Sequence, residues 1–452
     1  MNVASIYRCV LVIAALLTVS TLQSQVYYDQ GRQISGADSI AYIGSTGQSI
    51  NPSYPAISGR SFSVGLLQGG FSTHSEVLDN LYLQRFTLSN DTISQIDRDA
   101  IKSLVPETLD FEARLDAKWL NLSFNLPKWL AFSAELSESV QGDFFLDREM
   151  TDLFLDGLNA SWLPTNEMTA DLSNTQGSRI YYNHTRTLKV GLSRRIIDKD
   201  SLKIYGGVNV SRVWGLGHLN MSIDQNRIVG QSSFSTFYDI NYGSLDEFKD
   251  DLSKKLFSSS GTGWVYDLGL SLQLNQRIDF GIAVLDLGHL EWDKQTVVSD
   301  TDAIVLNQSI ENGIKSFALQ KESNYLYDAL GFKPGPRFRS EANTRLRLNT
   351  LYRYNENFST SIDWLLPLKE VEGLSYHSFI LGMRYRPDLI DINISSGLFY
   401  HSEFGLRVPF GLGYEVLGKG LVSISTNDIV SLVSGNSNPL SSLSIVVAGV
   451  RF

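Results

Sequence analysis

The sequence contains little cysteine and little histidine, and both shortages limit the chemistry that it can support. Its 452 residues include one cysteine, Cys9, and six histidines. Cys9 lies in an N-terminal stretch that would be removed as a signal peptide. The mature chain would therefore hold neither disulfides nor thiolate metal sites. The histidines form no H-E-x-x-H pair, and no G-x-S-x-G motif occurs. We therefore expect no catalytic residues, no metal site and no cofactor, and we expect that the protein is not an enzyme.

Long apolar runs are missing beyond the first residues, which excludes a polytopic helical membrane protein. The run from Cys9 to Leu17 follows Arg8 and precedes small and polar residues, a pattern typical of a secretory signal peptide cleaved near Ser24–Gln25. A membrane anchor helix is the alternative, but the run falls short of the roughly 20 apolar residues that span a bilayer. The formal net charge of −10 also argues against a nucleic-acid partner.

What the sequence has in abundance is alternation of apolar and polar residues, which begins at Ser61. In residues 266–274, YDLGLSLQL, every second residue is apolar, and residues 277–284, RIDFGIAV, repeat the pattern. Only Asn275 and Gln276 separate the two stretches, a connection typical of a β-hairpin. Further hairpins are predicted for the paired stretches 120–125 and 129–136, 188–196 and 201–210, 345–354 and 358–364, 378–386 and 389–400, and 404–416 and 421–425.

The remaining connections are long, so that short turns alternate with long loops along the chain. The long ones include residues 140–185, 223–262 and 293–341. Adding residues 61–71 and 444–452 gives about 14 strands. This layout predicts an all-β fold, a transmembrane antiparallel up-and-down β-barrel with short periplasmic turns and long extracellular loops. A secreted soluble β-sandwich is the alternative. It would have to bury the apolar faces of all these strands in cores of limited size.

Two stretches in the proposed extracellular loops have helical spacing. Residues 89–107 place isoleucine and leucine at loosely helical intervals, and residues 147–159, DREMTDLFLDGLN, predict a short acidic helix that ends near Gly157. Outward-facing aromatic residues near strand ends would form interfacial girdles in a barrel, although each also suits an ordinary sheet. They are Trp264, Trp364, Tyr352, Tyr354, Tyr385 and Tyr400.

The chain is thus divided into a signal peptide at 1–24, an N-terminal segment at 25–60 and a barrel at 61–452. The segment 25–60 is irregular, is rich in Gly and Ser, and contains Pro52 and Pro55, which would interrupt a strand. Because a wide barrel must be filled by water or by a plug, this segment is a candidate plug.

Charged residues predicted on the inner face of the strands are candidate lumen residues. A salt-bridged interior, contact with the plug, and selection of a solute are alternative interpretations of the set. Its members are Arg345, Arg347, Arg353, Asp363, Asp391, Arg407 and Glu415.

Several stretches resemble an uncharacterised family of outer-membrane barrels common in Bacteroidota. They are YDLGLSLQLNQRIDFGIAVLDLGHLEW at 266–292, SLKIYGGVNVSRVWGLGHLNM at 201–221 and STNDIVSL at 425–432. More distantly, SINPSYPA resembles the NPA element in the plug of long-chain fatty-acid transporters, an element that also occurs in barrels of the type IX secretion apparatus. Here Ser53 and Tyr54 are inserted between Asn51-Pro52 and Pro55-Ala56. Asn51, Pro52 and Pro55 are the candidate plug residues.

The end of the chain resembles the terminal aromatic signal by which outer-membrane barrels are recognised for assembly. In SIVVAGVRF the alternate residues Val446, Ala448, Val450 and Phe452 would face lipid. The resemblance implies an outer-membrane location in a Gram-negative cell, with membrane lipid and the barrel-assembly machinery as partners. It also implies passage or uptake of a small or hydrophobic solute. The alternative function is a non-transporting scaffold for surface or secretion-apparatus proteins.

Overall fold

The computed structural model describes most of the predicted barrel and a short part of the segment before it. The described residues are 51–57, 62–75, 99, 102–103, 107–126, 130–163, 169–172, 175, 177–224, 226–238, 258–305, 330–355, 357–369, 377–387, 392–402, 405–416, 420–434 and 440–451.

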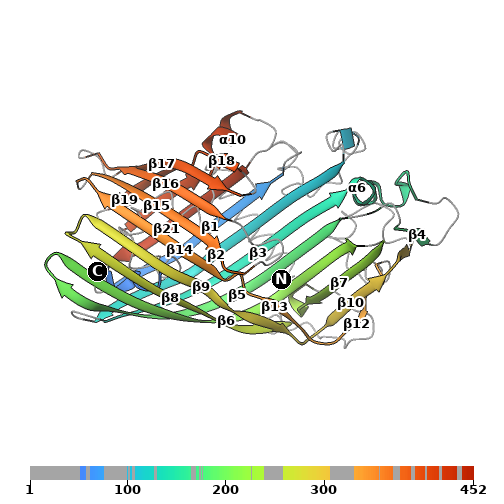
Figure 1. The fold of residues 1–452 in the computed structure, drawn as a ribbon, viewed down its shortest axis with the longest axis horizontal. Coiled ribbons are helices and arrows are strands. Elements are labelled where there is room, and N and C mark those ends of the chain that lie inside the picture. The colour runs from blue at the N-terminus through green and yellow to red at the C-terminus, as the bar shows by residue number, and fades with distance from the viewer. Residues whose placement is uncertain are drawn as a thin grey trace, which may run out of the picture.

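Fourteen strands among these residues pair with their neighbours in an unbroken cycle. All pairings are antiparallel, and the last strand, β21, pairs with the first, β1. The cycle therefore closes the sheet into an up-and-down barrel (Figure 1). In order it runs β1 (Phe62–His74), β2 (Thr108–Leu126), β3 (Leu130–Asp147), β5 (Arg179–Lys199), β6 (Leu202–Asp224), β8 (Gly261–Leu274), β9 (Ile278–Trp292), β14 (Arg345–Arg353), β15 (Phe358–Pro367), β16 (Ser378–Tyr385), β17 (Ile392–His401), β19 (Phe410–Val416), β20 (Gly420–Thr426) and β21 (Leu440–Arg451).

The predicted hairpins and the strand number are confirmed. For example, β8 and β9 pair from Leu274 and Ile278 upward, and β5 and β6 pair from Lys199 and Leu202 upward. The short turns therefore lie at one end of the barrel, which we call the turn end, at the left in Figure 1.

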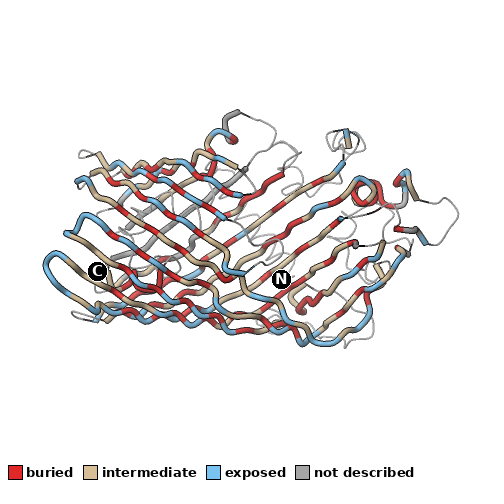
Figure 2. The backbone as a smooth tube through the Cα atoms, in the orientation of Figure 1, coloured by how far each residue is buried: buried red, intermediate tan, exposed pale blue. Residues whose placement is uncertain are grey.

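Side chains alternate between the two faces of the barrel wall, as the sequence predicts. Figure 2 shows buried and more exposed residues alternating along most strands. On β8, Leu268 and Leu270 are half exposed while Asp267 and Ser271 are buried. Apolar side chains are likewise exposed on β5, β9, β15, β16 and β17. An exposed apolar surface of this extent is found on proteins that sit in lipid, so the outer face is the membrane face and the inner face is the lumen.

The strands at the other end extend beyond the predicted ones, and some predicted loops contain strands. β3 reaches Asp147 and β5 begins at Arg179, both inside the predicted loop 140–185. Additional strands extend the wall or pair beside it: β4 (Thr169–Asp171), β7 (Arg227–Phe234), β10 (Thr296–Thr301), β11 (Ala303–Val305), β12 (Lys333–Pro334), β13 (Phe338–Glu341) and β18 (Gly405–Arg407). β7 pairs with residues 217–224 of β6, and β10 pairs with β7. We call this end of the barrel the loop end.

The prediction of one strand over residues 404–416 was wrong. The structure has two strands, β18 and β19, separated by Val408 and Pro409. Proline lacks the N–H that a strand ladder needs. The carbonyl of Val408 accepts a hydrogen bond from the N–H of Ile429, at the start of α10 (Ile429–Ser434).

The predicted acidic helix is confirmed as α6 (Arg148–Asp156), followed by the 3-10 turn η3 (Gly157–Asn159). The carboxylate of Asp147 caps its first turn by accepting from the N–H of Met150, and Gly157 ends it at a φ of 59°. α6 packs its leucines on the outer face of the long strands, in a core with Leu109, Met221 and Ile228. Most of the predicted helix at 89–107 lies outside the described residues.

Candidate functional site

A short segment, Asn51–Ile57, lies inside the barrel against the inner faces of its long strands. Its last four residues form α3 (Tyr54–Ile57), and the N–H of Tyr54 donates to the carbonyl of Asn51. Residues 51–55 are buried, although they are not part of any strand. We call this stretch the luminal segment. It is the described part of the candidate plug at 25–60.

Asn51 attaches the luminal segment to the wall and also shapes it. Its side-chain Nδ2 lies 3.1 Å from the carbonyl of Leu270 on β8 and 3.3 Å from that of Ile282 on β9. Its Oδ1 accepts from the backbone N–H and from the hydroxyl of Ser53, at 3.0 and 2.7 Å. One asparagine thus bonds to two strands and fixes the turn that follows it.

Ser53 adds a second bond to the wall. Its hydroxyl lies 2.6 Å from that of Ser271 on β8, and both serines are buried. Neither contact between the segment and β8 involves a charge.

Glycines in the wall allow the luminal segment to approach this closely. A Cβ placed on Gly207 of β6 would lie 2.0 Å from the carbonyl oxygen of Pro52, and one placed on Gly269 of β8 would lie 2.1 Å from Oδ1 of Asn51. Any larger residue at either position would displace the segment. The neighbouring inner-face position Gly281 on β9 also lies against Asn51.

Tyr54 extends the contact to β14, the strand next to β9. It is buried, and its hydroxyl accepts a hydrogen bond from Nδ2 of Asn349 on β14. Burial is the main cause that raises the pKa of Tyr54 well above its ordinary value, with smaller effects from Arg347 and Asp363. α3 itself lies against β2, β3, β5 and β6. The luminal segment therefore touches strands from β2 to β14.

Paired charges line the lumen around this segment. Each of these pairs joins a basic and an acidic side chain of the wall. They are Lys118–Glu135, Lys189–Asp267 at 2.7 Å, Arg345–Asp286, Arg347–Asp363 at 2.8 Å and Arg353–Asp279. The row runs through β2, β3, β5, β8, β9, β14 and β15.

The innermost pairs are fully shielded from solvent. Arg347 and Asp363 are 1% and 3% exposed, and Nε of Arg347 lies 3.1 Å from both carboxylate oxygens. Asp267 also accepts from Asn209 at 2.9 Å and from the N–H of Asp286 at 2.8 Å. These contacts offset the desolvation of buried ions.

The structure brings together some of the predicted lumen charges and separates others. Arg345, Arg347 and Arg353 face the lumen, and Asp363 is the partner of Arg347. Arg407 lies apart from them and pairs with Asp428 at 3.3 Å, beside α10. Asp391 lies outside the described residues, and Glu415 is placed in β19 without a described side chain.

The candidate assembly residues fall at the closing seam of the barrel. Within β21, Val446 lies opposite Gln68 of β1 and Ser423 of β20, and Ala448 lies opposite Gly65 and Leu421. Val450 belongs to the same strand, whose side chains are not described, and Phe452 lies outside the described residues. Their role in assembly stays a prediction.

Sequence reasoning missed six residues of the lumen row, which are Lys118, Glu135, Lys189, Asp267, Asp279 and Asp286. Lys189, for example, is buried on the inner face of β5, while its neighbours Leu188 and Val190 are apolar and exposed on the outer face. A charge flanked by exposed apolar neighbours in a barrel strand is a readable signal for the lumen. Ser53 and Tyr54, the inserted pair in the plug motif, were also missed as contact residues.

The described residues offer neither a metal-binding cluster nor a membrane-spanning helix. No group of three or more His, Cys, Asp or Glu side chains there could hold a metal ion. In that part of the chain, no helix is long and apolar enough to cross a membrane.

A family model described as "Family of unknown function (DUF5723)" matches residues 55–428. The search of curated proteins found no match. Among solved structures, a TodX deltaS2S3 mutant monoaromatic hydrocarbon channel is similar at 12% identity, with a TM-score of 0.49, covering 90% of this chain and 94% of that one.

Two further solved structures are similar over comparable lengths. The toluene transporter TodX of Pseudomonas putida has 12% identity and a TM-score of 0.42, covering 95% of this chain and 94% of that one. A Pseudomonas aeruginosa FadL homologue has 12% identity and a TM-score of 0.43, covering 95% and 96%. The closed strand pairing itself shows the barrel fold.

Proposed function

We propose that the chain, which belongs to the family of unknown function DUF5723, is an outer-membrane barrel for passage of a small hydrophobic solute. In this proposal a cleaved signal peptide exports the chain, the barrel spans the outer membrane, and the segment 25–60 is its plug. The observation that carries the proposal is the luminal segment, which lies in the lumen and whose described side-chain bonds to the wall all join neutral groups.

Neutral bonding makes the luminal segment a part that can move. Its side-chain bonds to the wall come from Asn51, Ser53 and Tyr54. Each such neutral hydrogen bond contributes about 1 kcal/mol net. The acids and bases of the lumen row bond to one another, so displacement of the segment would leave those pairs intact.

The lining also supports an uncharged solute. Because each named acid in the lumen row has a basic partner, the row presents no strong field of one sign that would select ions. The resemblance of SINPSYPA to the plug element of long-chain fatty-acid transporters supports a hydrophobic solute in particular.

A reversible crosslink between the luminal segment and the wall tests the proposal. The hydroxyls of Ser53 and Ser271 lie 2.6 Å apart, so the double variant Ser53→Cys and Ser271→Cys is suited to form a disulfide. Uptake of a radiolabelled monoaromatic hydrocarbon and of a long-chain fatty acid would be measured in cells that express the variant, with and without a reductant. We expect uptake above vector controls when the bond is reduced and loss of uptake when it is oxidised.

A matched crosslink controls for stiffening of the barrel. Ser425 and Ser444 lie opposite each other on β20 and β21, two strands that none of the described contacts joins to the luminal segment. Oxidation of Ser425→Cys with Ser444→Cys should leave uptake unchanged. Equal uptake by the oxidised and reduced Ser53–Ser271 variant would refute passage through a lumen gated by this segment.

A second candidate function is a non-transporting scaffold for surface or secretion proteins. The observation that favours it is the separate apolar core at the loop end, where α6 packs on the outer face of the wall with Leu172 and Ile304. Such a rigid platform would suit a protein partner. Recovery of the same partner protein with the purified barrel, together with no solute uptake by the reduced variant, would favour this function.

A further inference from the structure

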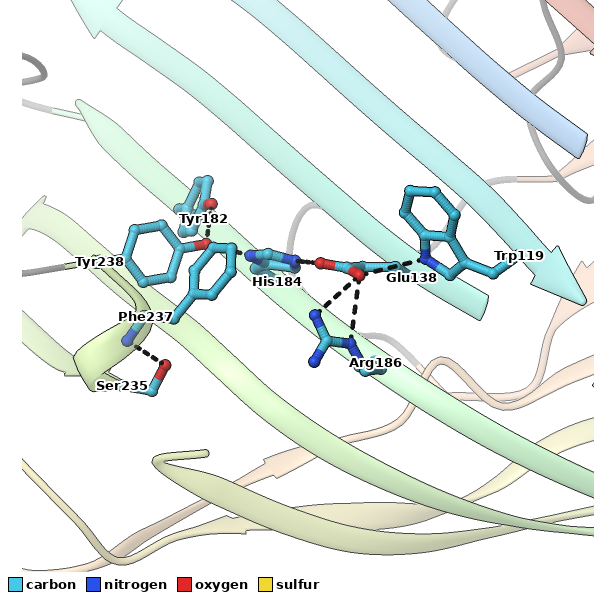
Figure 3. A network of polar contacts seen from close by, with 8 residues as sticks. All are labelled: Trp119, Glu138, Tyr182, His184, Arg186, Ser235, Phe237 and Tyr238. Atoms are coloured by element: carbon cyan, nitrogen blue, oxygen red, sulfur yellow. Dashed lines mark hydrogen bonds and ion pairs between the residues drawn. The ribbon is translucent and has the colours of Figure 1, made fainter. Parts of the chain in front are cut away.

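The outer face of the long strands carries a polar zone between two apolar zones. On β5, Leu188, Val190 and Leu192 are exposed toward the turn end, and Ile180 packs under α6 toward the loop end. The residues between them on the same face are Tyr182, His184 and Arg186. Figure 3 shows that they form a connected network with β2, β3 and the segment after β7.

Glu138 on β3 is the centre of this network. One of its carboxylate oxygens lies 2.6 Å from Nε2 of His184, and the other accepts from Nη2 of Arg186 at 3.1 Å and from the indole N–H of Trp119 at 3.4 Å. The hydroxyl of Tyr238, in η4 (Thr236–Tyr238), contacts Nδ1 of His184 (Figure 3). The network thus holds a carboxylate and a guanidinium on the membrane side of the wall.

The polar zone continues onto the next two strands. Arg186 lies opposite Trp214 of β6, and Arg212, two residues before Trp214, lies opposite Trp264 of β8. The guanidinium of Arg212 stacks over the ring of Trp264 at 5.1 Å. We call Trp119, Glu138, Arg186, Arg212 and Trp264 the outer-rim row. Among the described residues, Arg212 has no carboxylate partner, so the row has an excess of positive charge.

The height of the outer-rim row matches a membrane interface. Arg212 follows the first residue of β6 by ten positions, and Trp264 precedes the last residue of β8 by ten positions. Ten residues at about 3.3 Å each, tilted by about 40°, rise roughly 25 Å from the turn end. This is about the height of the apolar band of outer-membrane barrels. If the turns are periplasmic, the row lies at the headgroups of the outer leaflet.

We propose that the outer-rim row binds the phosphorylated headgroup of an outer-leaflet glycolipid. A guanidinium stacked on an indole keeps its in-plane N–H groups free to donate to phosphate oxygens. Arg186 supplies a second guanidinium diagonal to the first, and Glu138 can accept from sugar hydroxyls. The tryptophans lie where amphipathic rings prefer to sit. The inference rests on the proposed outer-membrane location but on neither the solute nor the plug.

Native mass spectrometry of the full barrel in detergent tests the proposal with two probes. One is a bisphosphorylated lipid A, and the other is the same lipid after enzymatic removal of its phosphates. We expect the wild type to retain the phosphorylated probe at least about tenfold more tightly, since charge-assisted pairs to phosphate are strong. Equal retention of the two probes would refute the proposal, because the acyl chains alone would then explain binding.

Variants locate the site on the barrel. Arg212→Gln combined with Arg186→Gln should abolish the preference for the phosphorylated probe. Arg194→Gln is the matched control, because Arg194 lies on the same face of β5 as Arg186 but near the turn end, and it should keep the preference. Heat-modifiable migration on gels checks that each variant is folded. A preference that survives in the double variant, or one lost equally in the control, would overturn the assignment. Neither readout depends on solute uptake, so this proposal can fail independently of the proposed function.

Discussion

Substitution of Gly207 by alanine should displace the luminal segment without altering any residue of the segment itself. A Cβ at this position would lie 2.0 Å from the carbonyl oxygen of Pro52 and 2.5 Å from the backbone nitrogen of Ser53. Both atoms belong to backbone, so a side-chain rotation cannot relieve the clash. The segment must shift away from β6, and Asn51 would then lose its fit against β8 and β9.

The magnitude follows from the bonds at risk. The segment makes four side-chain hydrogen bonds to the wall, two from Asn51, one from Ser53 and one to Tyr54. At about 1 kcal/mol each, their loss would cost about 4 kcal/mol. A change of that size shifts the equilibrium between seated and displaced segment by about three orders of magnitude.

The assay measures access to Ser53, which is buried in the wild type. Ser53→Cys provides a thiol for a membrane-impermeant maleimide, and the labelling rate should rise strongly when Gly207→Ala is added. Gly206→Ala is the matched control on the same strand. Its Cβ would point outward and meet the flexible end of Ile196, so labelling should stay at the wild-type rate. Equal labelling rates for Gly207→Ala and Gly206→Ala would contradict displacement of the luminal segment by the added Cβ.

Three further predictions concern the lumen pairs, the luminal tyrosine and the end of the chain. Arg347→Ala removes the charged group that faces the buried Asp363 and should lower the free energy of unfolding by about 3–5 kcal/mol. Lys369→Ala, in a pair with Glu341 whose side chains are 51% and 46% exposed, should cost about 1 kcal/mol or less. Urea unfolding of the barrel compares the two variants, and equal losses would contradict a dependence on burial. Burial raises the pKa of Tyr54, so the luminal segment bound to the wall holds the Tyr54 proton more tightly than a displaced segment does. Attachment of the segment to the wall should therefore be stable below about pH 10 and should weaken as pH rises above it. Maleimide labelling of Ser53→Cys across this range should show the rise, and Tyr54→Phe should remove it. Deletion of Phe452 should reduce the fraction of heat-modifiable, assembled barrel in membranes, and an unchanged fraction would dissociate the ending from assembly.

The strands of the barrel could be predicted from the sequence because each pairs with its neighbour through a local signal. A turn such as Asn275-Gln276 fixes the register of a hairpin, and period-2 alternation then assigns each residue to lipid or lumen. The same logic found Arg347 and Asp363, which lie on neighbouring strands of one hairpin. Arg407 does not join them because Pro409 interrupts its strand and because Asp428, the residue before α10, pairs with it. Neither effect is visible as periodicity.

The loop-end part of the wall and the contacts of the luminal segment could not be predicted, because the residues that meet there are distant in the chain. In β5 the outer-face residues are apolar at Leu188 and at the next two positions on that face, and polar at Arg186 and His184. A pattern based on lipid-facing strands therefore begins near Leu188, although the strand itself begins at Arg179. Asn51 bonds to residues more than 200 positions away. The motif around Asn51 indicated a plug, but only the fold identifies the glycines that make room for it.

The separation of charged and neutral contacts in the lumen has a mechanical consequence. If Asp363 or Asp267 were bonded to the luminal segment, movement of the segment would expose an unpaired buried ion, at a cost of several kcal/mol. In the described contacts these acids bond to Arg347 and Lys189 of the wall, and the side chains of the segment bond through amide and hydroxyl groups. The wall thus keeps its electrostatic pairing whether the segment is seated or displaced. The barrier to displacement is then a few neutral bonds and the packing of Pro52 against a glycine, a cost that solvation of the freed amide and hydroxyl groups by water can partly offset.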